Sequence, residues 1–211
     1  MLSDGDSHTV RRIEAFSDIV IGFCLAEVGV NLAFPKSGDA ATLWLNVGFF
    51  LAAFGFIAII WWFHHRLFTT FFVLNQFTLV LNFIFLAGIV LTTYFLQLFV
   101  HAGAIGENAA PYFRLWAFCF ANVYTLLGIL LAIGMWMRRD ELAAKDIRWG
   151  FQRIASILMV IGFFVIVGTP ANFANGGLSD ARLAVAFVVA MIVLGRIALP
   201  MWLKRAIPDP K

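Results

Sequence analysis

Six apolar stretches, each bounded by polar or charged positions, divide the chain into candidate membrane spans. A hydrocarbon core of about 30 Å is crossed by about 20 residues in an α-helix. The stretches are Phe16–Phe34, Leu43–Phe63, Phe71–Val100, Tyr112–Met137, Ile154–Gly168 and Leu183–Leu203. This pattern predicts an all-α, polytopic membrane protein with six transmembrane helices, no soluble domain and a single transmembrane domain over residues 1–211.

Two of these stretches differ from an ideal span. The fifth has only 15 residues and is followed by Pro170. The third has 30 residues and includes four amide side chains, so we expect its first turns to project beyond the bilayer or to pack against protein. Short loops are expected at Pro35–Thr42, Phe63–Thr70, His101–Pro111 and Thr169–Arg182, and a strongly charged linker at Arg138–Arg153.

The composition supports a membrane protein. Apolar residues make up 62% of the chain and charged residues 13%, whereas a soluble domain has roughly 45–50% and about 25%. The net charge of +3 does not indicate nucleic acid, because the basic residues gather at the ends of the apolar stretches. No phosphate loop, nucleophilic triad or metal-ligand spacing is present, so we expect neither an enzyme nor a cofactor.

The distribution of basic residues predicts the orientation. If the N-terminus is cytoplasmic, six spans place 11 Lys and Arg residues inside and 3 outside, with Arg196 within the sixth span. Cytoplasmic loops of membrane proteins are enriched in Lys and Arg. We therefore predict that both termini are cytoplasmic and that the protein is a multi-pass protein of the bacterial inner membrane. The same bias supports the short fifth span.

One face of the first span combines bulky apolar side chains with an acid. Spacings of 3 and 4 place the following residues on this face: Phe16, Ile19, Phe23, Glu27 and Val30. Glu27 lies about 16 Å from Phe16 along the helix axis, close to the bilayer midplane. A carboxylate at that depth costs at least ~2.5 kcal/mol on insertion scales, so it is a candidate functional residue.

A compact polar motif opens the same span. Arg12 precedes Phe16, Ser17 and Asp18 at the start of the apolar run. Taken alone, Ser17 and Asp18 suit the positive end of a helix dipole, and Arg12 suits the lipid headgroups. That interpretation accounts for one acid but not for the compactness of the pattern.

The motif Arg-x-x-x-Phe-Ser-Asp resembles the transmembrane protein 175 family of lysosomal and prokaryotic potassium channels. A second similarity is His64-His65-Arg66 after the second span, which resembles the family's connection between its second and third helices. The six-helix layout and the chain length are also similar to those of the prokaryotic members. The resemblance covers the whole chain in architecture and about ten residues in motif.

The resemblance implies a homotetramer that conducts potassium or another monovalent cation through a pore lined by four first helices. It implies a constriction formed by rings of bulky apolar side chains, which here places Ile19, Phe23, Glu27 and Val30 along the pore. The chain departs from the family here. The channels tend to have Ile or Leu with Thr in this stretch, whereas this chain has Phe23, Ala26 and Glu27.

The residues leave three interpretations of Glu27 open. It is hydrogen-bonded to an amide of a neighbouring helix, it belongs to a cation-attracting ring in the pore, or it carries protons. The candidate amides are Asn46, Asn82 and Asn122. A cation channel is therefore the leading hypothesis, the alternatives being a proton- or ion-coupled carrier that uses Glu27 and a membrane scaffold without transport.

A polar network is expected at the inner end of the first span. We expect Arg12, Ser17 and Asp18 to form hydrogen bonds with His64 or His65 and so to hold the first helix against its neighbours. Adjacent histidines on a helix point about 100° apart, which disfavours a shared metal ion. The charged linker after the fourth span is expected to contact anionic membrane lipid.

The orientation can be tested by labelling introduced cysteines. Ser37→Cys and Asn108→Cys should react with an impermeant thiol reagent in intact cells, because both positions are predicted to be outside. Lys145→Cys should react only after permeabilisation. Reaction of Lys145→Cys in intact cells would contradict the predicted orientation.

Overall fold

The computed structural model describes residues 4–30, 40–104, 107–168 and 199–207, and all of its elements are helices. They are α1 (Asp4–Val30), α2 (Ala40–Thr70), α3 (Gln76–Ala104), α4 (Ala110–Met137), α5 (Ala144–Gly168) and α8 (Leu199–Ala206). The prediction of an all-α membrane protein is confirmed. Within these residues, α2 to α5 each contain a stretch long and apolar enough to cross a membrane.

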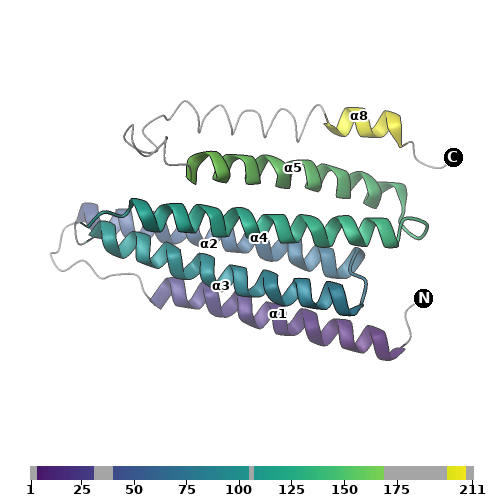
Figure 1. Cartoon of the computed structure of the whole chain (residues 1–211), viewed down its shortest axis with the longest axis horizontal. Helices are drawn as coiled ribbons and strands as arrows, with labels where there is room; N and C mark the ends of the chain where they lie inside the picture. Colours follow the sequence, from purple (N-terminus) through teal and green to yellow (C-terminus); the bar gives the residue numbers. More distant parts are fainter. Residues whose placement is uncertain (1–3, 31–39, 105–106, 169–198, 208–211) are drawn as a thin grey trace.

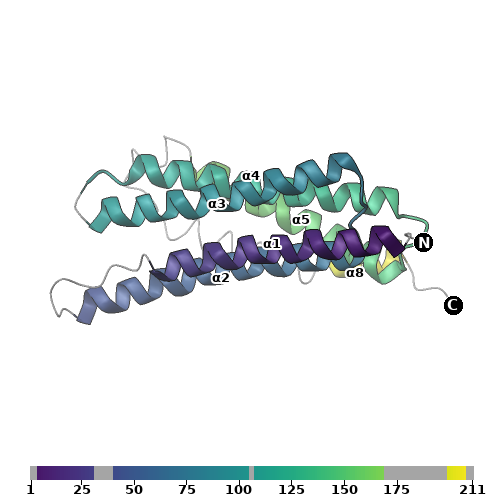
Figure 2. The ribbon, with the colours of Figure 1, turned by 90° about the horizontal axis from the view of Figure 1, so that it is seen from below.

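The helices run back and forth along one common direction (Figure 1). α3 packs against α4 and α4 against α5, while α1 packs against α2 and α3. Figure 2 shows α1 and α2 together on one side of α3 and α4. The start of α1, the end of α2 and α8 all lie at one end of the bundle, which we call the α1-start end (Figure 1).

The core of the bundle follows α4. Phe120, Val123 and Leu127 are buried there, and Phe120 lies 4.4 Å from Phe164 of α5 between ring centroids. On the other side of α4, Gly88 of α3 faces Val123, and a Cβ at Gly88 would come within 3.0 Å of it. Small residues of this kind allow membrane helices to approach closely, which matters because lipid provides no hydrophobic drive for association.

Three helices extend by seven or more residues beyond the apolar stretches that predicted them. α1 begins 12 residues before Phe16, and α5 begins ten residues before Ile154. The predicted loop Phe63–Thr70 is wrong, because α2 remains helical to Thr70. Hydropathy marks only the part of a helix that suits lipid. Charged residues beyond it remain helical here, since Arg66 at the end of α2 is paired with Asp146 of α5.

The start of α3 explains why the third apolar stretch appeared too long. Asn75 Oδ1 accepts a hydrogen bond from the Thr78 backbone N–H, and Thr78 Oγ1 accepts one from the Asn75 N–H. This reciprocal pair caps the helix. The residues before it form a turn in which Phe71 is buried. Gly134 of α4 lies against that turn, where a Cβ would collide with the Phe71 carbonyl oxygen.

The sixth predicted span, 183–203, lies outside the described residues except for its last five positions, which belong to α8. α8 packs against α5. Arg148 of α5 donates a hydrogen bond of 2.7 Å to the backbone carbonyl of Ile207. Arg196 also lies outside the described residues.

Candidate functional site

A buried chain of hydrogen bonds joins α1, α2 and α3. Asn82 Nδ2 donates to Ser17 Oγ at 3.2 Å, and Asn82 Oδ1 lies 2.9 Å from His64 Nε2. All three side chains are fully buried. The His64 ring also stacks on Phe85 of α3, with centroids 5.1 Å apart and planes within 3° of parallel.

The donors and acceptors of these hydrogen bonds can be assigned from Ser17. Its hydroxyl donates to the carbonyl of Ile13, one turn earlier in α1, so its oxygen is left to accept. The Asn82 atom that faces Ser17 must therefore be the amide nitrogen, and the amide oxygen must face His64. His64 is then the tautomer that carries its proton on Nε2 and donates to Asn82.

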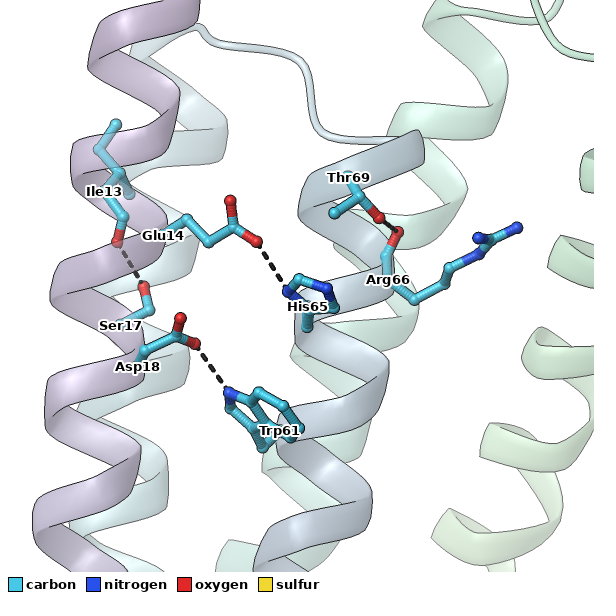
Figure 3. Close-up of polar contacts among 8 residues, drawn as sticks. All are labelled: Ile13, Glu14, Ser17, Asp18, Trp61, His65, Arg66 and Thr69. Carbon is cyan, nitrogen blue, oxygen red and sulfur yellow. Dashed lines mark hydrogen bonds and ion pairs between the residues drawn. The ribbon is translucent and has the colours of Figure 1, made fainter.

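A second set of contacts lies between α1 and α2 (Figure 3). Trp61 Nε1 donates to Asp18 Oδ1 at 2.8 Å, and His65 Nδ1 lies 2.9 Å from Glu14 Oε1. The Trp61 and His65 rings stack with centroids 5.7 Å apart. Both acids of this part of α1 are therefore directed at α2.

These contacts differ in part from the predicted network. Ser17 is linked to a histidine, His64, but through Asn82 rather than directly. Asp18 bonds to Trp61 instead of a histidine. Arg12 is exposed and belongs to none of these contacts.

The sequence interpretation missed Trp61 and did not predict the partner of Asn82. Trp61 lies four residues before His65, so the two share a helix face, and that spacing was available in the sequence. Asn82 was a candidate partner for Glu27, but it binds Ser17. Ser17 lies about 15 Å from Glu27 along α1, which is too far for Asn82 to reach both.

Arg66 of the second motif joins α2 to α5. Its guanidinium lies 3.0 Å from Asp146 and 5.5 Å from the centre of the Trp149 ring. Arg153 lies 5.3 Å from the same ring and 5.0 Å from that of Phe63. The two histidines beside Arg66 point to different helices. Among the described residues no three acids, histidines or cysteines are grouped as metal ligands.

The opposite face of α1 is exposed in the single subunit. Ile19 is 69% exposed, Phe23 68% and Val30 82%, while Ile21 and Cys24 on the other face are fully buried. Six of the exposed residues recur at spacings of 4, 3, 4, 3 and 4, and Arg11, Ala15 and Gly22 beside them are exposed as well. We call the set of six the seam, and it consists of Arg12, Phe16, Ile19, Phe23, Ala26 and Val30.

The seam contains the predicted pore face with one difference. Phe16, Ile19, Phe23 and Val30 belong to it, and Phe16 also meets Phe83 of α3 with centroids 6.1 Å apart. Glu27 is half-buried, whereas its neighbour Ala26 is exposed. Glu27 therefore lies at the edge of the exposed face rather than at its centre.

α1 is also the long helix least suited to lipid. Residues 13–30 contain three acids, Glu14, Asp18 and Glu27. Among the described residues, α1 is the one long helix without a stretch apolar enough to be a candidate span. A helix of this kind needs protein or water, rather than lipid, against its polar parts.

The buried hydrogen-bonded chain can be tested for its contribution to stability. Asn82→Leu removes the amide and leaves buried groups of Ser17 and His64 without a partner, so it should destabilise the fold by about 1–3 kcal/mol. Asn122→Leu is the matched control, because Asn122 is exposed on α4. Thermal unfolding in detergent should show a lower midpoint for Asn82→Leu only. Equal midpoints for the two variants would contradict this role.

Comparison with known proteins is consistent with the geometry. Residues 12–92 match the model of a family described as endosomal/lysosomal potassium channel TMEM175. This segment contains the Arg-x-x-x-Phe-Ser-Asp motif and all three members of the buried chain. No curated protein matches. The matched family and the similar solved structures are described as potassium channels, not as enzymes.

Two solved structures share the fold over most of the chain. One is a variant of the potassium channel MtTMEM175 in complex with a nanobody–MBP fusion protein. It is 21% identical, with a TM-score of 0.58, over 89% of this chain and 92% of that one. The other is a lysosomal potassium-selective channel TMEM175 homologue from Chamaesiphon minutus. It is 18% identical, with a TM-score of 0.56, over 87% and 98%. Residues 12–92 thus match the TMEM175 family model, and most of the chain shares the fold of these two solved structures.

Proposed function

We propose that this multi-pass membrane protein is a potassium-conducting channel, a homotetramer in which four copies of α1 line the pore. The observation that carries the proposal is the exposed seam of α1, in a chain with the fold of potassium channels. The proposal also keeps both termini cytoplasmic, in a bacterial inner membrane whose lipid surrounds the tetramer.

The chemistry of α1 argues that protein and water, rather than lipid, cover the seam. Polar and ionisable side chains in membrane helices face the bundle interior or a water-filled cavity. α1 carries three acids in its last 18 residues, whereas α3, α4 and α5 are the more apolar helices. A tetramer with α1 at its centre leaves the apolar helices toward lipid.

The spacing of the seam suits helices that meet around an axis. A repeat of 4 and 3 residues averages 3.5, which keeps one stripe facing a common axis when helices supercoil with a left hand. Each seam residue then forms a ring with its copies. The rings in order are those of Arg12, Phe16, Ile19, Phe23, Ala26 and Val30.

The contacts opposite the seam give α1 a defined rotation. Ser17 is buried against α3 through Asn82, and Asp18 and Glu14 are bonded to α2. These residues lie on the side of α1 away from Ile19 and Phe23. A rotation that carried the seam out of the pore would break the fully buried hydrogen bond between Asn82 and Ser17, and losing a buried hydrogen bond is costly.

The apolar rings supply a basis for selecting cations. An ion that crosses a narrow ring of Phe23 side chains must lose part of its hydration shell, and hydrophobic constrictions oppose wetting. Potassium is larger than sodium and holds water less tightly, so its loss of water costs less. Glu27, beside the seam, places negative charge near the outer half of the same path.

Phe23→Ala tests the constriction. Removing the ring should raise unitary conductance and bring the permeability ratio of potassium to sodium closer to one, because the widened pore no longer forces dehydration. Phe77→Ala is the matched control, since Phe77 is 62% exposed on α3 and lies outside the proposed pore. The measurement is the reversal potential in planar bilayers under mixed potassium and sodium.

Two results would count against the proposal. If Phe77→Ala changed selectivity as much as Phe23→Ala, the seam would not be the pore. If the parent moved potassium without resolvable unitary currents, an ion-coupled carrier that uses Glu27 would be favoured, because carriers turn over too slowly to give them.

A further inference from the structure

We infer that Arg12 forms a ring of four positive charges at the pore mouth on the α1-start end, and that this ring makes the conductance asymmetric. This inference rests on the proposed tetramer with α1 along the pore. It adds a rectifying element to that pore, outside the apolar constriction.

Arg12 lies on the same face of α1 as the proposed pore-lining residues. Its side chain is exposed, and it lies on the seam one turn before Phe16, about 6 Å along the axis. Ile19 is two turns further on at the same angle around the helix. Any arrangement that turns Ile19 and Phe23 toward a common axis therefore turns Arg12 toward it as well.

The neighbouring acids do not neutralise Arg12. Glu14 is directed at His65 and Asp18 at Trp61, both on α2 (Figure 3). On the helical wheel, Glu14 is about 200° from Arg12 and so lies on the opposite side of α1. Arg12 is the one charged residue of the seam, so the charge that the seam itself presents at this end is positive.

The two halves of the proposed pore then differ in the sign of their charge. Four guanidinium groups around a water-filled mouth lower the local concentration of cations by about two- to fourfold near physiological salt. On the far half of α1 no base follows Arg12 as far as Val30, and Glu27 adds negative charge there. Potassium that enters from the Arg12 side therefore starts from a depleted mouth, and its unitary current is smaller.

The test is single-channel recording of the parent in planar bilayers, with equal potassium chloride on both sides. The parent should carry about two- to fourfold less current for one direction of potassium flow than for the other at equal and opposite voltages. Raising the salt to 1 M shortens the screening length to about 3 Å and should bring the ratio close to one. This arm needs no substitution, so it does not depend on the folding of a variant.

Three variants assign the effect to Arg12. Arg12→Gln should remove most of the asymmetry by raising the smaller current, and Arg12→Lys should retain it because the charge remains. Arg11→Gln is the matched control. Arg11 is the neighbouring exposed base, about 100° around the helix from Arg12 and off the seam, so its loss should leave the ratio unchanged.

Several outcomes overturn the inference, and they are distinguishable from a failure of the proposed function. Symmetric currents in the parent at low salt, or equal effects of Arg11→Gln and Arg12→Gln, would show that Arg12 does not face the pore, while the potassium channel would stand. Absence of unitary potassium current in the parent would overturn both the channel and the ring.

Discussion

The hydrogen bonds from His64 through Asn82 to Ser17 are the interaction on which the arrangement of this protein depends. They join three helices at a fully buried site, and each member is hydrogen-bonded to the next. Removing any one would leave a buried polar group without a partner, which costs more than the hydrogen bond itself contributes. Polar contacts of this type hold membrane helices together where apolar surface cannot.

These hydrogen bonds determine which face of α1 points into the subunit. Ser17 faces inward, so Ile19, Phe23 and Val30 face outward, where they are 69%, 68% and 82% exposed. Arg12 and Phe23 differ in chemistry but share this outward face. In the proposed tetramer, this helix forms both the charged mouth and the apolar constriction, while its acids at positions 14 and 18 are bonded to α2.

The sequence was sufficient for the fold class and for the face of α1, because both follow from residue spacing. It predicted Ile19, Phe23 and Val30 on one side of a helix, and it predicted α4 to within two residues of its start. It was insufficient for the ends of α1, α2 and α5, because hydropathy does not detect the part of a helix that continues into polar surroundings. The role of Asn82 could not be predicted either. An amide in an apolar span has a partner, but only the packing of α3 against α1 shows which one.

In the proposed tetramer, four copies of α1 meet along the seam. Disulfide crosslinking of adjacent positions on α1 tests this arrangement most directly. In a background with Cys24→Ser and Cys119→Ser, Ala26→Cys should form disulfide-linked dimers on oxidation in the membrane, because its copies lie around the pore. Leu25→Cys should not, since its side chain points about 100° away and is half-buried within the subunit. Crosslinking at Leu25→Cys without crosslinking at Ala26→Cys would contradict the account.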